Sequence, residues 1–398
     1  MQAMEPRNPI DAVMHCDPYP YYARLLSGPP LYYDNAVRLW IACSAATVAE
    51  IFASSVCRVR PMSEPIPALI SGSPAGEIFG SLVRMNDGAR HDQPKLALER
   101  ALASLPSAEV DARARYFARQ SVPPMGDTRA LSTWMLDTPV TVVADLLGFA
   151  DDARPTVATW TREFVACLSP LSTSEQFAAA NAAASLLRLR MQSLLQSTQP
   201  QSGSLLARVR AQAEAVSWAD STAIIANLVG LLSQTYEATS GLIGNAIVAL
   251  ATHPRLIDEV RARADGWDQL VHETSRYDSP VQNTRRYIVE RTRIAEVDLE
   301  PGSAILLVLA AANRDPHANR CPQEFRLDRS NRCVFTFSRG AHACPGEALA
   351  RTIAAAAVAV LFETLPNGWL RQIAWSWRPS ANGRLSVFRS LNESGAHS

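Results

Sequence analysis

Lysine is almost absent from this 398-residue chain, in which Lys95 is the only one, so arginine supplies nearly all of the positive charge. Lys and Arg together number 38, as do Asp and Glu, and the formal net charge at pH 7 is zero. A chain without net charge has no long-range field that attracts polyanions or anionic lipid. We therefore expect neither nucleic acid nor a membrane surface as a partner.

Long apolar runs are missing as well. The N-terminus lacks the apolar segment of a secretory signal, and the richest apolar stretch, residues 223–232, contains Asn227 and leads into polar Ser233 and Gln234. A helix that spans a bilayer needs about 20 consecutive apolar residues. We therefore expect a soluble, cytoplasmic protein.

Paired cysteines are a third absence. The chain has seven cysteines, an odd number, and no two of them have the C-x-x-C spacing. This pattern argues against a disulfide framework and against a zinc site. Most of the cysteines are expected to be small buried hydrophobic residues.

Helical patterns dominate the sequence. Residues 93–260 carry Ala, Leu and Arg at helical spacing, whereas residues 31–42 predict a hairpin and residues 286–289 and 304–309 predict later strands. No linker, internal repeat or low-complexity segment divides the chain. We predict a single, mainly α-helical domain over residues 1–398, with one small sheet near the N-terminus and a second strand region after the helices.

One predicted helix is unusually long. Ser217 to Asp220 has the spacing of a capping box, and His253-Pro254 ends a periodic run of about 36 residues, or about 54 Å. Its middle, residues 233–241, concentrates hydroxyls, one carboxylate and a glycine within apolar sequence. Such hydroxyls can bond back to helix carbonyls and bend the helix. The polar midpoint indicates either a functional site or a solvated face.

Cys344 lies at the start of a predicted helix, residues 347–359, directly before Pro345-Gly346. Free amide hydrogens and the positive dipole end of a helix N-terminus favour the thiolate over the thiol. A metal ligand needs that ionised form. A cysteine at a helix start is nevertheless more often structural when it is considered alone.

The segment around Cys344 reads Phe337-x-x-Gly340-x-His342-x-Cys344-x-Gly346 and resembles the haem-binding signature of the cytochrome P450 family. The resemblance implies a P450-like fold that holds haem b, iron protoporphyrin IX, with Cys344 as the axial thiolate of the iron. It further implies that the two glycines let the loop approach the porphyrin, that Phe337 shields the sulfur, and that His342 faces a propionate. Thiolate ligation favours O–O cleavage in such enzymes.

Further segments resemble the same family. Glu273-x-x-Arg276 is similar to its E-x-x-R pair, in which helical spacing places a carboxylate beside a guanidinium. The third partner of that pair would be an arginine just before Phe325. Glu324 occupies this position, so the third partner is unassigned.

Three cations match the positions of propionate contacts in the family. Arg285 follows Arg276 at the spacing of a propionate-binding arginine, and His91 and Lys95 match two contacts on an earlier helix. The family usually has arginine where Lys95 stands. A lysine still neutralises a carboxylate, but as a point charge without the bidentate fork.

The central helix departs from the family pattern. The resemblance assigns Gln234, Thr235, Glu237, Ala238 and Thr239 to its oxygen-side segment, where the acid is present as Glu237 but Ala238 replaces the usual threonine. That threonine normally helps to deliver protons to dioxygen. Three explanations are open: a substrate hydroxyl or carboxylate holds the water, Gln234 or Thr235 replaces the hydroxyl, or the chemistry depends less on this relay. Thr239, one residue further on, is expected to face the helix backbone.

The resemblance implies a monooxygenase that inserts one oxygen atom from O₂ into a small, largely apolar molecule, in secondary metabolism. The expected electron donors are a ferredoxin and its NAD(P)H-dependent reductase, docking near Arg339 and Arg351. Residues 65–83 and 281–283 are expected to line the substrate pocket. The alternatives are a peroxygenase or oxidative-coupling enzyme and a non-catalytic haem-binding module.

Overall fold

The computed structural model describes residues 5–168, 172–197, 203–366 and 368–391. Its α-helices are α1 (Pro9–Ala12), α2 (Tyr19–Leu26), α3 (Ala45–Ala53), α4 (Pro74–Ser81), α5 (Ala89–Ala103), α6 (Ser107–Gln120), α7 (Thr128–Leu147), α8 (Arg154–Ala166), α9 (Ser174–Gln196), α10 (Leu205–Ala215), α11 (Ser221–Thr252), α12 (Leu256–Arg261), α13 (Gly266–Tyr277), α14 (Leu309–Asn313) and α15 (Glu347–Thr364). The strands are β1 (Leu31–Asp34), β2 (Leu39–Ala42), β3 (Cys57–Arg58), β4 (Thr284–Ile288), β5 (Thr292–Ile294), β6 (Val297–Leu299), β7 (Ala304–Leu307), β8 (Ile373–Trp377) and β9 (Ser386–Ser390). The prediction of a mainly helical fold with small sheets is confirmed.

The N-terminal hairpin and the later strands form one sheet rather than two. Strands β1 and β2 pair as predicted, and the Asp34 carboxylate accepts the Ala36 amide at 2.8 Å in their turn. The sheet order is β1-β2-β7-β4-β3, with Trp40 of β2 opposite Ile305 of β7 in parallel pairing. The prediction of separate regions is therefore wrong, because the open edge of β2 pairs with a strand from far along the chain. The hairpins β5–β6 and β8–β9 were not predicted.

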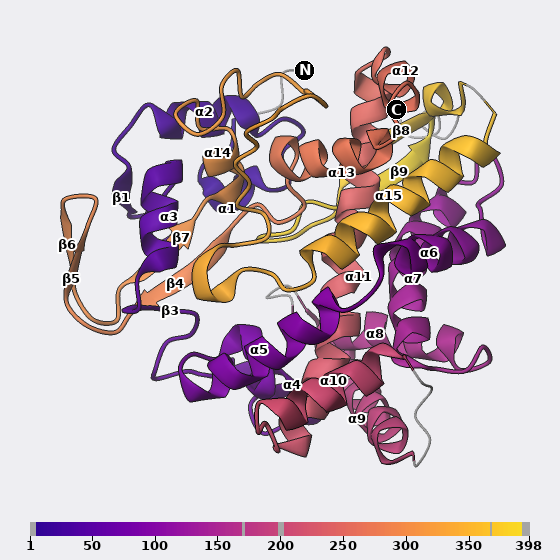
Figure 1. Ribbon diagram of the computed structural model, residues 1–398. Helices are drawn as coiled ribbons and strands as arrows, with labels where there is room; N and C mark the ends of the chain where they lie inside the picture. The colour runs from indigo at the N-terminus through magenta and orange to yellow at the C-terminus, as the bar shows by residue number, and fades with distance from the viewer. Residues whose placement is uncertain (1–4, 169–171, 198–202, 367, 392–398) are drawn as a thin grey trace.

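The long central helix, α11, has 32 residues and begins four positions later than predicted. Its N-cap is Asp220, whose side chain accepts the Ala223 amide at 3.0 Å, whereas Ser217 lies outside the helix in a left-handed conformation with φ 57°. The predicted capping box is therefore wrong. In Figure 1, α11 passes through the centre of the molecule, between the five-stranded sheet and helices α6, α7 and α8.

Two glycines of α11 let its neighbours pack closely. A Cβ on Gly241 would lie 2.6 Å from Cβ of Pro280, and one on Gly244 would lie 2.7 Å from Sδ of Met135 on α7. Asn245, one position further, donates to the Asp278 carbonyl at 2.8 Å. The second half of α11 is thus held against α7 and against the segment that leads from α13 into β4.

Burial of the cysteines differs from the prediction. Cys43, Cys57 and Cys167 are buried, but the other four retain water-accessible surface, so the expectation that most are buried is wrong. Within the described parts of the chain, no helix combines the length and the apolar character that crossing a bilayer requires.

Candidate functional site

Cys344 occupies a tight loop between the short 3₁₀ helix η3 (Gly340–His342) and α15. The Cys344 amide donates to the Phe337 carbonyl at 2.7 Å and closes the loop. Phe337 itself packs, partly buried, against the hydrophobic core beneath α15. The loop therefore holds the cysteine directly before the helix N-terminus, as predicted from the sequence.

Gly340 is required by the geometry of this loop. Its φ is +64°, in the left-handed region that favours glycine, and an added Cβ would lie 2.7 Å from the Phe52 carbonyl oxygen on α3. Gly346 is the N-cap of α15, and its Cβ position lies 3.9 Å from Sγ of Cys344. The loop thus docks against α3 with its sulfur beside the first turn of α15.

The Cys344 thiol is surrounded by protein and still accessible to water. Burial raises its pKa, whereas a hydrogen bond from the Gly346 amide and the charges of Lys95 and Arg84 lower it. The residue nevertheless keeps exposed surface. A side chain with both properties lines an internal cavity, and the three opposing groups are those that would stabilise a thiolate.

His342 lies beside His91 of α5, with 4.3 Å between the ring centroids. Nε2 of His342 is 2.9 Å from an Asp87 carboxylate oxygen. His91 is buried, and its Nε2 has no hydrogen-bond partner within the described chain. An unpaired buried nitrogen costs about 1–3 kcal/mol, so His91 fits an acceptor supplied from outside the chain, such as a propionate.

Lys95 and Arg285, the other two predicted propionate contacts from the earlier helix and from β4, lie in different surroundings. Lys95 is buried, donates to the Ala343 carbonyl of the cysteine loop and lies 3.2 Å from Glu99. Arg285 of β4 is exposed, and its guanidinium has neither an ion pair nor a hydrogen bond with the described residues. Its neighbour Arg286 faces the other side of the sheet and stacks over Phe52 at 5.0 Å. An unpaired arginine and an orphaned histidine fit a group with two carboxylates.

The middle of α11 presents an accessible face although its flanks are buried. Gln234 is exposed, and Thr235, Glu237 and Ala238 are partly exposed, at the three- and four-residue spacing of one helix face. Since α11 runs through the centre of the molecule, this face borders internal space. The arrangement favours the interpretation as a site over that of a solvated outer face.

The donors on this face are already engaged. Gln234 Nε2 donates to the Gly230 carbonyl at 2.9 Å, and Thr235 Oγ1 donates to the Leu231 carbonyl at 2.7 Å. Helix α11 is continuous through these bonds. Both residues keep only oxygen lone pairs, and one further amide hydrogen of Gln234, for a water.

Glu237 pairs with a residue that sequence reasoning missed. Arg378, which directly follows β8, donates from Nη2 to the Glu237 carboxylate, and both side chains are partly exposed. No signal in the sequence pointed to Arg378, because 141 positions separate the partners. The C-terminal hairpin therefore brings a cation to the middle of α11.

The E-x-x-R pair forms a fully buried ion cluster. Arg276 donates to both oxygens of Glu273, at 2.7 and 3.1 Å, and neither residue is exposed. Arg332 and Arg329 also reach this carboxylate, at 2.8 and 3.3 Å. They supply the third partner that the sequence left unassigned. The run of arginines after Phe325 was the available signal, but only packing selects which of them reach Glu273.

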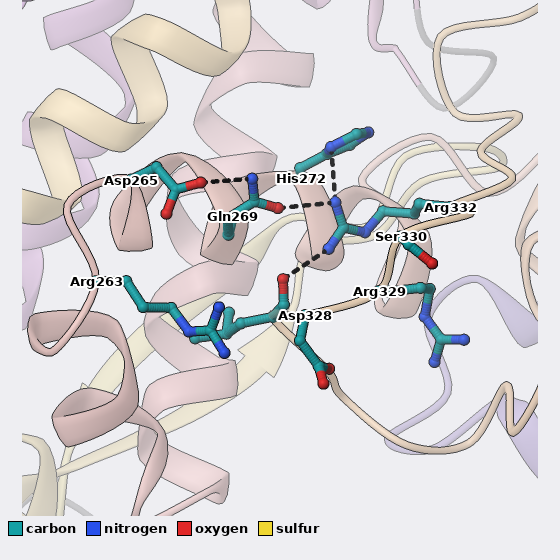
Figure 2. A pocket seen from close by; sticks show the side chains of 9 residues that line it. Arg263, Asp265, Gln269, His272, Asp328, Arg329, Ser330 and Arg332 are labelled. Carbon is teal, nitrogen blue, oxygen red and sulfur yellow. Dashed lines mark hydrogen bonds between the residues drawn. The ribbon is translucent and has the colours of Figure 1, made fainter.

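A surface pocket of about 450 Å³ borders this cluster, and its lining includes Arg263, Asp265, Gln269, His272, Leu327, Asp328, Arg329, Ser330 and Arg332. Figure 2 shows Arg332 between Gln269 and His272, with donor–acceptor distances of 3.1 and 2.8 Å. The buried arginines of this pocket already bind protein oxygens. The pocket is thus part of the structural ion cluster.

Comparison with known proteins agrees with the fold and the cysteine loop. The family model for cytochrome P450 matches residues 267–365. The biotin biosynthesis cytochrome P450 of Bacillus subtilis (strain 168) is 35% identical over 175 residues, which are 44% of this chain and 42% of that protein. The cytochrome P450 monooxygenase PikC of Streptomyces venezuelae is 33% identical over 232 residues, 58% of this chain and 54% of that protein. The chain thus spans about half the length of the curated relatives it matches.

Solved structures show the fold over nearly the whole chain. The crystal structure of CalO2 has a TM-score of 0.82 at 23% identity, covering 98% of this chain and 99% of that one. P450BioI, in complex with an acyl carrier protein ligated to hexadec-9Z-enoic acid, has a TM-score of 0.80 at 21% identity, covering 93% and 97%. The chain is thus similar to cytochrome P450 proteins in residues 267–365, which include the cysteine loop, and in its overall fold.

Proposed function

We propose that the protein is a haem-thiolate monooxygenase that inserts one oxygen atom from O₂ into a C–H or double bond of a small, largely apolar molecule. The observation that supports this most directly is the Cys344 loop, which presents an accessible sulfur beside a helix N-terminus inside the fold. When bound, haem b supplies the iron at which dioxygen is reduced, and thiolate ligation favours O–O cleavage.

The chain itself would have three tasks around that group. Cys344 binds the iron as a thiolate, stabilised by the Gly346 amide. His91, Lys95 and Arg285, together with His342, hold the two propionates. Phe337 excludes water from the sulfur side through its packing under α15.

Protons must reach the oxygen side without a threonine at position 238. We propose that Glu237, held by Arg378, provides the carboxylate end of the route. The oxygens of Gln234 and Thr235 can accept hydrogen bonds from a water, although their donors are engaged with the helix. A hydroxyl or carboxylate of the substrate is the other candidate holder of that water. If Thr235→Ala and Gln234→Ala both leave the coupling of electrons to product unchanged, the first arrangement is wrong.

Electrons are proposed to come from a ferredoxin and its NAD(P)H-dependent reductase, in the cytoplasm. Arg339 of the cysteine loop is exposed and donates to the Val334 carbonyl, but it pairs with no carboxylate of the described residues. Arg351, the other predicted contact, is partly buried and pairs with Asp268 at 2.6 Å. We therefore assign Arg339 the larger part in docking.

The test of the proposal begins with a spectrum. The reduced carbon-monoxide complex should absorb at the position diagnostic of thiolate ligation, and Cys344→Ser should abolish that band. Substrate-dependent oxidation of NADPH with a reconstituted ferredoxin system should follow. A thiolate band without turnover, both with ferredoxin and NADPH and with hydrogen peroxide, would instead indicate a non-catalytic haem-binding module.

The missing threonine favours one second candidate, a peroxygenase or oxidative-coupling enzyme. Chemistry driven by peroxide needs no proton delivery to dioxygen, so an alanine at position 238 would not impair it. Product formation with hydrogen peroxide but not with ferredoxin and NADPH would select this alternative.

A further inference from the structure

Arg84 lies in a short segment that is fastened to the central helix. It is the middle residue of the 3₁₀ helix η2 (Val83–Met85), between α4 and α5. The Val83 amide donates to the Asn227 side chain at 2.9 Å, and that side chain donates to the Ser81 carbonyl at 2.9 Å. Leu82 packs on Gly230, where a Cβ would lie 2.6 Å from Cδ2 of Leu82. The backbone that carries Arg84 is therefore fixed to α11 upstream of Glu237.

The guanidinium of Arg84 has no partner among the described residues, neither an ion pair nor a hydrogen bond. Its side chain is accessible to water, yet burial by surrounding protein lowers its pKa. The charges that oppose this shift are Glu237 of α11 and Cys344. Arg84 thus resembles Cys344 in lining an internal cavity. Its charged neighbours are Glu237 of the central helix and Cys344, the candidate iron ligand.

The nearby charges do not compensate Arg84. Glu237, the carboxylate whose charge acts on Arg84, already pairs with Arg378. A cation that surrounding protein partly removes from water gains when an anion pairs with it. The planar guanidinium binds a carboxylate through two parallel hydrogen bonds, which a lysine at this position would not provide.

The charged surroundings of Arg84 differ from those of His342, one of the candidate propionate contacts. The charged groups that influence His342 are Asp87, His91 and Arg286. None of these is among the groups that influence Arg84, whose neighbours are Glu237 and Cys344. Arg84 is therefore influenced by Glu237 of α11, the helix to which its backbone is fastened, and by Cys344.

We propose that Arg84 binds the carboxylate of an organic-acid substrate inside the cavity between α11 and the Cys344 loop. This inference rests on the proposed function, because it requires that the cavity accept a substrate. It deepens that function by giving the substrate class: an apolar body with a carboxylate end that pairs with Arg84.

The test uses the haem-loaded protein and two matched sets of probes. Octanoate, dodecanoate, hexadecanoate and phenylacetate are titrated beside their methyl esters, and binding is followed by the shift of the Soret band and by calorimetry. The carboxylates should bind more tightly than the esters. Arg84→Gln should weaken carboxylate binding tenfold or more, equivalent to about 1.4 kcal/mol, and change ester binding less than about twofold. Arg84→Lys should restore part of the difference.

Arg90→Gln is the matched control, since Arg90 is exposed in the first turn of α5, six residues after Arg84, and its side chain donates to the Gly80 carbonyl. It should leave both probe sets unchanged. Equal affinity of wild type for acids and esters, or no binding of any acid, would overturn the inference. Loss of haem from Arg84→Gln with unchanged acid preference would assign Arg84 to a propionate instead. Failure of the proposed function is separate, because it appears as a missing thiolate band in the wild type.

Discussion

At the scale of single residues, the buried charges near Glu273 explain how α13 is held in place. Three arginines share its carboxylate, and burial opposes their attraction, so the pKa of Glu273 settles below its ordinary value. His272, the preceding residue, accepts a hydrogen bond at Nδ1 from Arg332 at 2.8 Å (Figure 2). That bond requires a neutral imidazole nitrogen, because a protonated one has no lone pair.

Acid should therefore destabilise the protein through His272. Burial, and then the charges of Arg351 and Arg332, lower its pKa from 6.5 to about 3. The unfolded chain takes up a proton near pH 6.5 that the folded chain does not, so stability present above pH 6.5 is lost as the pH falls toward 3. We expect His272 to lower the free energy of unfolding, measured in urea, by at most ~1.4 kcal/mol for each pH unit below 6.5. His272→Gln should make the free energy of unfolding depend less on pH.

The informative window lies between pH 6.5 and 4.5, since Glu273 titrates below its ordinary 4.5. His317→Gln, which removes an exposed histidine, should keep the wild-type slope. Equal slopes for wild type and His272→Gln in this window would contradict the assignment.

At the scale of elements, α11 combines close packing with an accessible polar middle. Ser233, Thr235 and Ser240 donate their hydroxyls to carbonyls three or four residues earlier, so the helix stays continuous through its polar segment. The glycines that follow bring β9 and α7 against the same helix. Gln234, Thr235 and Glu237 thus keep accessible surface in the middle of the helix, while its glycines fix its position.

Gly244→Ala should destabilise the fold by about 1–3 kcal/mol, because the new methyl group would overlap Met135 and Ser386. The better helix propensity of alanine, worth about 1 kcal/mol, offsets only part of this. Urea unfolding measures the difference. Gly28→Ala is the control, since its Cβ would meet only the Leu25 carbonyl at an ordinary 3.5 Å. A Gly244→Ala protein as stable as wild type would show that β9 moves away at no cost.

At the scale of the whole molecule, Arg384 ties the N-terminal segment to the C-terminal hairpin. Its guanidinium donates to the carbonyls of Val13, His15 and Cys16 and pairs with Asp278 at 2.9 Å, with Trp377 stacked on it at 3.5 Å. The arginine is 2% exposed. One buried side chain thereby joins segments that are nearly the whole length of the chain apart.

Arg384→Met should cost about 3–5 kcal/mol, because it removes the cation that pairs with buried Asp278 and the donor to three backbone carbonyls. Thermal unfolding should shift to lower temperature, and amide exchange should accelerate in residues 13–16. Arg389→Ala, on the exposed side of β9, is the matched control and should behave as wild type. Unchanged exchange near the N-terminus would show that other contacts hold this segment.

The sequence by itself determined the features that depend on neighbours along the chain. Helical periodicity predicted α11 within a few residues, the Asp34 turn predicted the first hairpin, and the spacing around Cys344 predicted a loop ending at a helix. These features follow from local backbone preferences, which a short window of sequence contains. The family resemblance has the same source, since its signature is one continuous segment.

Only the tertiary structure decided the contacts between distant segments. The parallel pairing of β2 with β7, the ion pair of Glu237 with Arg378 and the cluster of Glu273 with Arg329 each join residues that no local pattern links. Their partners are selected by packing of the whole chain, because many arginines of equal local character compete for each carboxylate. For the same reason, the sequence assigned Arg84 no role, and only its place beside α11 and Cys344 makes it a candidate substrate contact.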